Sequence, residues 1–367
     1  MGRVSIVRTD GGVTEGLSRA IEFIGGLGRF VRQGESVLLK PNLNGADVYT
    51  NKEMVVSLIE MLRDIGAGRV FIAESTFGNA ATTRMFFEKT GYAELASRYG
   101  VDLINLNESE AVEVEVANPL ILDKIRIAKE VYDADKIINL PSMKVHYATG
   151  VSLALKNLKG FLVGAEKRHF HEIGLDKAIV DLNNTLKVDL NIVDCITCME
   201  RMGPHGGDPL ALNLLIAGEQ AAEVDHVGCQ VMGYGPGEVK HLAQYVEMNG
   251  IELSAVEVIG EKIADVAHPF KKVMMQDLIP DGFTVHDVNA CCTCMNAFLL
   301  SCRVLKGTPT QPVEIHMGSL TEEDAASINL KVAFGNCCVN HLKSLKPIRG
   351  CPPYPFALGE VLSEMCG

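Results

Sequence analysis

The chain has 367 residues, of which 47% are hydrophobic and 22% charged, and its formal net charge is −12. This composition predicts a packed globular protein and excludes a disordered chain. The negative charge argues against nucleic acid as the main partner, because phosphate binding requires clustered Lys and Arg. No apolar run reaches the roughly 20 residues of a transmembrane helix, so we expect no membrane span. The eleven cysteines are odd in number and unevenly placed, which favours a cytoplasmic protein over a secreted disulfide scaffold.

The first half of the chain alternates strand and helix patterns. Short β-rich runs occur at 4–7, 36–39, 70–73, 103–106 and 136–140. An apolar stripe from Met54 to Leu62 predicts a helix over residues 52–65, and a two-residue alternation between 112 and 127 predicts a hairpin. Strand–helix alternation of this kind indicates a mostly parallel sheet that is covered on both faces.

The same alternation continues to the C-terminus. Further strands are predicted at 190–193, 212–217, 256–259, 313–317 and 330–334, and helices at 175–186, 221–232, 239–248, near 295, after Thr321 and at 356–365. We therefore predict an α/β fold in two parts. Residues 1–265 form a mostly parallel body, and residues 266–367 form a smaller, cysteine-rich α/β domain.

The cysteines are concentrated in this second part, where seven lie between positions 291 and 351. Cys291 and Cys294 form Cys-x-x-Cys at the start of a predicted helix, Cys337 follows a predicted strand, and two prolines follow Cys351. Thiolates are soft ligands, and four of them favour an iron–sulfur cluster or zinc over a hard cation. We predict a 4Fe-4S cluster on these four residues in a reducing, anaerobic setting, with structural zinc on the same ligands as the alternative.

The spacing of these cysteines also carries a resemblance. Cys-x-x-Cys, then Gly-x-Cys, then Gly-Cys-Pro-Pro resembles the cluster-binding pattern of nickel–iron hydrogenase small subunits and the related quinone-oxidoreductase subunit. The resemblance implies a 4Fe-4S cluster on the same four ligands. The sequence differs from the pattern of those families in one spacing. Cys337 and Cys351 are only 351 − 337 = 14 positions apart, which is closer than in those families. The neighbouring Cys292 and Cys338 leave open whether either replaces a named ligand.

Basic residues gather in the middle of this acidic chain, between positions 144 and 171. Such a concentration favours an anion site for a carboxylate or a phosphate, and a solvated surface patch is the alternative. We predict that Lys144 and His146 are catalytic, with His146 as the proton donor because imidazole titrates near neutral pH. The predicted substrate-binding residues are Lys40, Asn42, Lys156, Lys159, Arg168 and His169.

These basic motifs resemble the family called domain of unknown function 362. The motifs are Lys-Pro-Asn at 40–42, Lys-x-His at 144–146, Leu-Lys-Asn-Leu-Lys-Gly at 155–160, Arg-His-Phe-His at 168–171, Asp-Leu-Asn at 181–183 and Gly-Pro at 203–204. The resemblance covers roughly residues 1–260. Members often carry a ferredoxin-like cluster segment, so the resemblance implies an iron–sulfur protein but names no substrate.

Together these features predict an iron–sulfur reductase, in which a cluster passes electrons to a small anion held in the basic crevice. One alternative is a non-catalytic electron carrier or cluster-delivery protein that works with a redox protein partner. Another is a structural zinc protein whose pocket performs hydrolytic or lyase chemistry. Cys195 and Cys198 form a second Cys-x-x-Cys, which is either a further redox or metal pair or two ordinary thiols.

Overall fold

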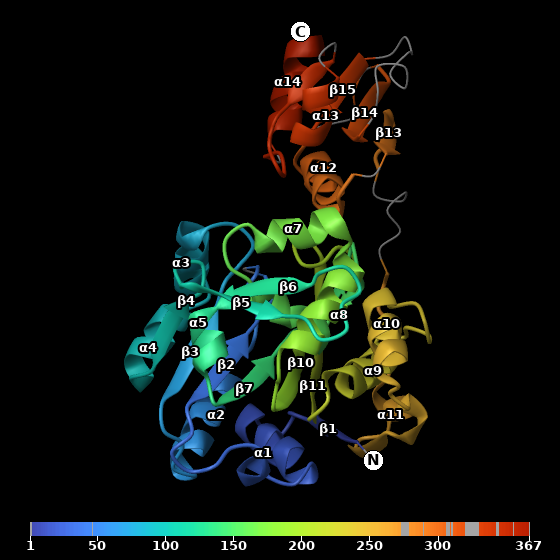
Figure 1. Cartoon of the computed structure of the whole chain (residues 1–367). Coiled ribbons are helices and arrows are strands. Elements are labelled where there is room, and N and C mark those ends of the chain that lie inside the picture. Colours follow the sequence, from blue (N-terminus) through green and yellow to red (C-terminus); the bar gives the residue numbers. More distant parts are fainter. Residues whose placement is uncertain are drawn as a thin grey trace. The chain divides into compact units, whose positions relative to one another are not determined.

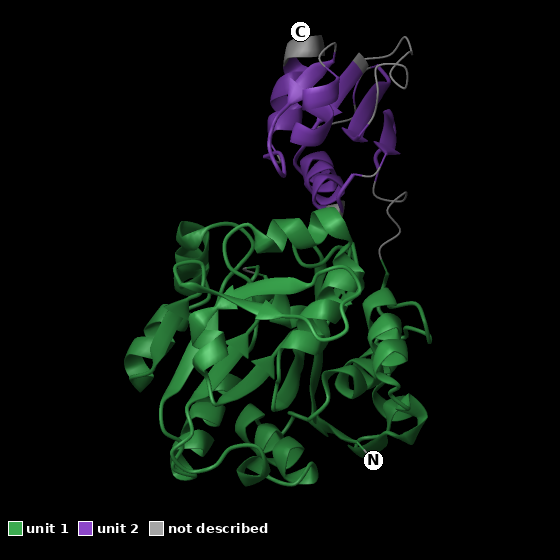
Figure 2. Cartoon of the chain, in the orientation of Figure 1, with its two compact units in different colours: residues 1–272 green, residues 273–367 purple. Residues whose placement is uncertain are grey.

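The computed structural model describes residues 2–45, 47–272, 279–288, 290–305, 309, 311–319, 330–342, 345–354 and 356–366. The chain divides into two compact units, Met1–Lys272 (unit 1) and Val273–Gly367 (unit 2), shown in Figure 2. The predicted boundary after residue 265 falls inside unit 1. The reason is that the backbone N–H groups of His268 and Phe270 donate hydrogen bonds to the carbonyls of Val231 and Met232.

A ten-stranded sheet forms the centre of unit 1 (Figure 1), with eight strands in the order β12-β1-β11-β10-β7-β2-β3-β4 and with β8 and β9 attached beside β10. The strands are β1 Arg3–Arg8, β2 Val37–Pro41, β3 Val70–Glu74, β4 Asp102–Asn105, β7 Lys136–Leu140, β8 Ser142–His146, β9 Gly150–Ser152, β10 Leu190–Glu200, β11 Asp208–Gly218 and β12 Glu257–Gly260. The pairs from β10 through β4 are parallel, and β11 runs antiparallel to both neighbours. The prediction of a mostly parallel α/β body is confirmed.

Helices cover both faces of this sheet. Apolar residues of α1, α2 and α4 pack against one face, and α6 contacts α8 and α9 over the other face. The helices of unit 1 are α1 Val13–Phe23, α2 Lys52–Asp64, α3 Ala80–Lys89, α4 Tyr92–Tyr99, α5 Lys129–Asp133, α6 Ala154–Asn157, α7 Glu166–Ile173, α8 Leu175–Thr185, α9 Ala221–Val231, α10 Lys240–Asn249 and α11 Ile263–Val266.

Two local predictions for unit 1 hold. Helix α2 buries the predicted stripe, and the Asn51 side chain caps it by accepting hydrogen bonds from the N–H groups of Glu53 and Met54. The predicted hairpin is the antiparallel pair β5 (Ala111–Glu115) and β6 (Lys124–Ala128). Both patterns are local in sequence, so periodicity alone was enough to find them.

Unit 2 contains a parallel four-stranded sheet, β13 (Phe283–Val288), β14 (Val313–Gly318), β15 (Leu330–Phe334) and β16 (Lys346–Ile348). Its helices are α12 (Cys292–Val304), α13 (Asn336–His341) and α14 (Ala357–Cys366). Phe298 of α12 makes edge-on ring contacts with Phe283 and Phe334, so α12 covers one face of the sheet. The predicted helix after Thr321 lies outside the described residues. Among the described helices, none is both long and apolar enough to cross a membrane.

Candidate functional site

The carboxyl ends of β2 and β3 carry a buried ion pair. The Nζ of Lys40 donates to Oε2 of Glu74 at 2.8 Å and to the carbonyl of Pro41 at 2.7 Å. Glu74 also accepts hydrogen bonds from the backbone N–H groups of Leu43 and Ser75. Burial lowers the pKa of Lys40, and the neighbouring Glu74 carboxylate opposes that shift. Lys40, which the sequence predicts to bind substrate, therefore has a protein partner for its charge.

The Leu-Lys-Asn-Leu-Lys-Gly segment lies directly over this pair. A Cβ added at Gly160 would come within 2.6 Å of Lys40 Nζ and closer still to Glu74 Oε1. The carbonyl of Gly160 also accepts a hydrogen bond from the Ser75 hydroxyl. A side chain at position 160 would therefore require the buried ion pair to shift.

Lys144, on β8, is the second buried lysine of this edge. Its Nζ donates to Oδ1 of Asn42 at 2.8 Å and to the carbonyl of Val48 at 2.6 Å. Burial lowers the pKa of Lys144 to about 7, and the charge of Lys156 acts in the same direction. Lys144 is thus a group of this site that changes charge near neutral pH.

His146 lies two residues further along β8. Burial lowers its pKa well below the usual range, assisted by the charges of Lys156, His171, Lys159 and His205. Its Nδ1 accepts a hydrogen bond from the N–H of Ala148, which places the proton of the neutral ring on Nε2. The premise that His146 titrates near neutral pH is therefore wrong for the protein as described, because burial keeps the ring neutral.

Further basic side chains surround His146. Lys159 Nζ lies 2.7 Å from Nε2 of His171, and Lys156 is half-buried. The pKa of His205 is lowered to about 4 by burial and by the charge of Lys144. The structure therefore groups Lys144, His146, Lys156, Lys159, His171 and His205, which we call the basic cluster.

Helix α7 separates two of the predicted residues from this cluster. Lys167 and His171 lie one turn apart on the inward side, where Lys167 donates to the Thr76 carbonyl at 3.1 Å. Arg168 and His169 are exposed. The sequence analysis predicted no helix for this segment and named Arg168 and His169 as substrate-binding residues. In a helix, successive residues turn by about 100°, so the structure selects Lys167 and His171 instead.

Four asparagines connect the strands below the basic cluster. Asn42 donates to Asn157 at 2.9 Å, Asn157 to Asn139 at 2.8 Å, and Asn139 to Asn191 at 2.9 Å. Asn157 also donates to the carbonyl of Lys40 at 3.2 Å. This amide ladder links β2, β7 and β10 and fixes the position of Asn42, the partner of Lys144.

A cavity of about 480 Å³ opens beside the same edge and is lined in part by Asp47, Asn51, Asp194 and Thr197. Burial raises the pKa of Asp194 to about 6, although the backbone N–H groups of Ile196 and Asn51 donate to its carboxylate. An acid and a base, Asp194 and Lys144, thus titrate near neutral pH within one neighbourhood, an arrangement typical of functional sites.

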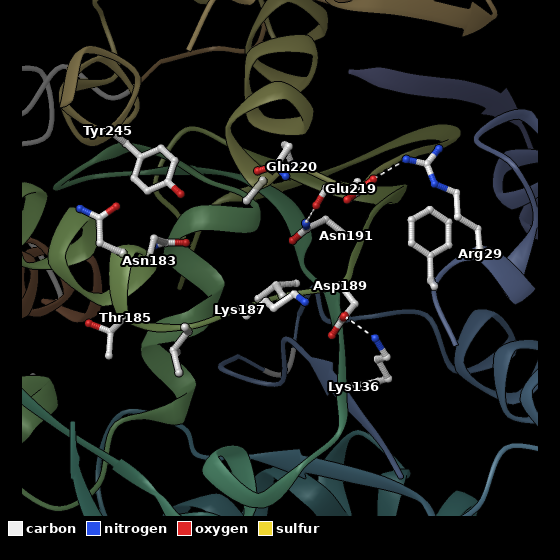
Figure 3. A pocket seen from close by; sticks show the side chains of 15 residues that line it. Arg29, Lys136, Asn183, Thr185, Lys187, Asp189, Asn191, Glu219, Gln220 and Tyr245 are labelled. Carbon is white, nitrogen blue, oxygen red and sulfur yellow. Dashed lines mark hydrogen bonds and ion pairs between the residues drawn. The ribbon is translucent and has the colours of Figure 1, made fainter. Parts of the chain in front are cut away.

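Figure 3 shows another hollow, of about 460 Å³, lined by residues that include Lys136 and Asp189, where β7 and β10 begin. Four of its charged groups are already paired, Lys136 with Asp189 at 3.0 Å and Arg29 with Glu219 at 2.6 Å. In open α/β sheets, ligands bind at the carboxyl ends of strands. We therefore assign the candidate site to the opposite edge.

In unit 2, the four predicted cluster ligands are neighbours. The Cys294 thiol donates a hydrogen bond to Cys291, and this bond, burial and the charges of Cys291, Cys351 and Cys337 together raise the pKa of Cys294. That hydrogen bond, with the N–H groups of Cys294 and Thr293, lowers the pKa of Cys291 to about 5. Cys291 is therefore deprotonated at neutral pH. It lies at the N-terminus of α12, where the helix dipole favours negative charge.

The backbones of the two other cysteine loops are joined to each other. Asn336 N–H donates to the Gly350 carbonyl at 2.9 Å, and Gly350 N–H donates to Asn336 Oδ1 at 2.9 Å, so the loops are tied together. Gly335 has a φ of 94°, and a Cβ there would lie 2.8 Å from Cys294 Sγ. The donor set, four thiols from three loops with a glycine where a side chain would intrude, suits a 4Fe-4S cluster or zinc.

The remaining cysteines fit less well as ligands. Cys338 is buried against Ala333, Val339 and Leu342, so it belongs to the core of unit 2. The side chain of Cys292 lies outside the described part of the structure. In unit 1, Cys195 and Cys198 are fully buried on β10, and burial raises the pKa of Cys195, which is the property of an ordinary protonated thiol.

The family model described as "Domain of unknown function (DUF362)" matches residues 37–230. A thylakoid-associated protein of Synechocystis sp. is 30% identical over 295 residues, which is 76% of this chain and 88% of the relative. The matched region contains the buried ion pair, the amide ladder and the basic cluster.

Two solved structures are more distantly similar. A protein from Thermotoga maritima shows 16% identity and a TM-score of 0.38 over 66% of this chain. The lactate racemase apoprotein from Thermoanaerobacterium thermosaccharolyticum shows 13% identity and a TM-score of 0.43 over 63%. This chain spans 59% and 57% of their respective lengths. At these TM-scores neither similarity bears on function.

Proposed function

The chain belongs to the DUF362 family, and from this premise we propose that it is an iron–sulfur reductase. Unit 2 would hold a 4Fe-4S cluster on Cys291, Cys294, Cys337 and Cys351. Unit 1 would bind a small anion at the basic cluster. When bound, the iron–sulfur cluster would supply the electron transfer, and the side chains of unit 1 would hold and protonate the anion.

The grouping of thiols around Cys294 is the observation that carries this proposal. The four cysteines come from three segments spread over 351 − 291 = 60 positions, and only folding brings them together. Small buried cysteines of a core would have no need for a glycine at position 335 or for paired loops. A site with a depressed pKa at Cys291 is one that offers a thiolate to a metal.

The basic cluster supports the second half of the proposal. Positive groups held together at low dielectric repel one another, and a bound anion would relieve that repulsion. Lys144, with a pKa of about 7, gains a proton most easily when an anion is present. Because His146 is neutral, Lys144 is the better proton donor of the two, which changes the roles that the sequence alone favoured.

Anaerobic purification followed by iron and sulfide analysis and electron paramagnetic resonance tests the cluster. We expect about four irons and four sulfides per chain, the composition of a 4Fe-4S cluster. Cys351→Ser should lose most of the iron, because a hydroxyl is a poor substitute for a thiolate. Cys302→Ser, on the same unit but outside the group, should keep it. Zinc without sulfide in the wild type would favour the structural-zinc alternative.

The electron-carrier alternative differs in what unit 1 does. A carrier or delivery protein needs no anion, so phosphate and dicarboxylate binding to Lys144→Met should then equal binding to the wild type. For a reductase, Lys144→Met should keep the cluster but bind phosphate and dicarboxylates more weakly than the wild type.

Cytoplasmic location is also part of the proposal. The relative from Synechocystis sp. is called thylakoid-associated, so cell fractionation with a salt wash of the membranes is the appropriate test.

A further inference from the structure

A second set of metal-ligating side chains lies in unit 2, away from α12. His286 of β13 and His316 of β14 are register partners in the parallel pair, and Glu314 stands two positions before His316. Alternate residues of a strand point to the same face, so the three side chains share one face of the sheet. Phe283, which contacts α12, has the opposite parity and lies on the other face.

The three side chains converge on one point. His286 Nε2 lies 3.5 Å and His316 Nε2 lies 3.4 Å from the same atom, Glu314 Oε2. These distances exceed the roughly 2.7–3.2 Å of an N–H···O hydrogen bond. They match the roughly 3.3 Å that separates two ligand atoms bound tetrahedrally at about 2.05 Å from one zinc ion.

Burial gives an independent indication of a missing partner. His316 is fully buried, and neither of its ring nitrogens has a hydrogen-bond partner within the described residues. Buried polar atoms are normally satisfied, and a bound cation would satisfy Nε2. Glu314 is 6% exposed, whereas the His286 side chain is 38% exposed and leaves a path for an ion. The two imidazole rings stack at 4.6 Å, which keeps both edges directed at the carboxylate.

We propose that His286, Glu314 and His316 bind a divalent transition-metal ion. Two imidazoles and one carboxylate form a ligand set that zinc accepts readily. Three protein ligands also leave a coordination position for water or another ligand. Lys331 is the register partner of Glu314 on β15, so a cation of the protein also lies next to this carboxylate in the sheet. The site uses none of the four clustered cysteines and stands independently of them.

Zinc titration of the full chain, purified anaerobically and treated with a chelator, tests this site. We expect zinc bound in a shell of nitrogen and oxygen neighbours, measured by X-ray absorption at the zinc edge. Glu314→Gln and His286→Asn should each weaken this binding at least tenfold, roughly the smallest loss seen when a group supporting a ligand is removed. His341→Asn, an exposed histidine of the same unit, is the matched control and should bind like the wild type.

Two results would overturn the proposal: a wild-type zinc shell that contains only sulfur, or zinc that stays bound to nitrogen and oxygen in both variants.

Glu314→Gln and His286→Asn are preferred to changes at His316, because removing a fully buried ring could unfold the unit. Melting curves with and without zinc check the fold, since zinc should raise the melting temperature of the wild type but not of folded Glu314→Gln. Iron content, measured in parallel, reports on the cysteine site separately.

Discussion

Lys40 and Glu74 form an ion pair that water scarcely reaches, with their side chains 0% and 3% exposed. Removing one partner of such a pair leaves an uncompensated buried charge. Glu74→Gln should therefore lower the free energy of unfolding by about 3–5 kcal/mol, as measured by urea titration. Replacing both residues with apolar ones should restore part of the loss. Glu113→Gln, which breaks the exposed pair with Lys124, should leave the midpoint nearly unchanged.

Gly160→Ala should destabilise unit 1 through the same pair, because the new methyl group would overlap the Lys40 and Glu74 side chains. Overpacking of this kind costs about 1–3 kcal/mol. Gly28→Ala is the matched control, since a Cβ there meets nothing within 4 Å. Equal melting temperatures for the two variants would mean that the ion pair can move aside.

The buried Lys144 predicts a specific pH dependence. Its pKa is about 7 in the folded chain and about 10.4 when unfolded, so between these values the unfolded state holds a proton that the folded state has lost. The free energy of unfolding should therefore rise with pH, by up to about 1.4 kcal/mol per unit, relative to Lys144→Met. Urea titrations at pH 7, 8 and 9 measure the difference, and Lys124→Met is the exposed control. Parallel curves for wild type and Lys144→Met would mean that the lysine stays charged.

His171 and His169 offer a test of which side of α7 takes part in anion binding. His171→Asn should weaken phosphate binding by about 0.5–1.5 kcal/mol, the usual value of one hydrogen bond, or roughly 2- to 13-fold in Kd. His169→Asn, whose ring is exposed on the same helix, should not change it. Calorimetric titration with phosphate gives both values, and a larger effect at His169 would contradict the assignment of the basic cluster.

Gly335→Ala should lose iron, because its Cβ would displace the Cys294 thiol and because a φ of 94° strains any other residue. Gly282→Ala separates these two causes. It has a similar φ of 87°, but its Cβ would lie 3.4 Å from Pro309 and is near no cysteine. Iron analysis should show loss only in the first variant. Loss of iron in both would point to strain in unit 2 rather than to the cysteine contact.

Much of the fold was predictable from local pattern. The apolar stripe of α2 and the hairpin β5–β6 follow from the spacing of apolar residues, which recur every three to four positions in the helix and every two in the strands. Lys40 and Glu74 directly follow the predicted strands 36–39 and 70–73, so their positions at strand ends follow from the sequence. Their direct contact does not, because it depends on β2 and β3 pairing across a helix.

The misassigned part of the site was α7. No helix was predicted at residues 166–173, although the spacing of Lys167, Phe170 and His171 fits the buried side of a helix. That spacing was the available signal, and it would have directed attention to Lys167 and His171. The set of His286 and His316 had no comparable signal, since 316 − 286 = 30 positions separate two residues that meet only through strand register.

The amide ladder from Asn42 to Asn191 has a consequence for how this edge of the sheet behaves as conditions change. Amides neither gain nor lose protons over the range in which Lys144 and Asp194 titrate, and their dipoles are little affected by added salt. The charge of the asparagines beneath the basic cluster therefore does not change with pH, whereas the charges of Lys144 and Asp194 do. Acidification therefore changes the charge of the buried groups Lys144 and Asp194 but not the charge of the ladder that supports them.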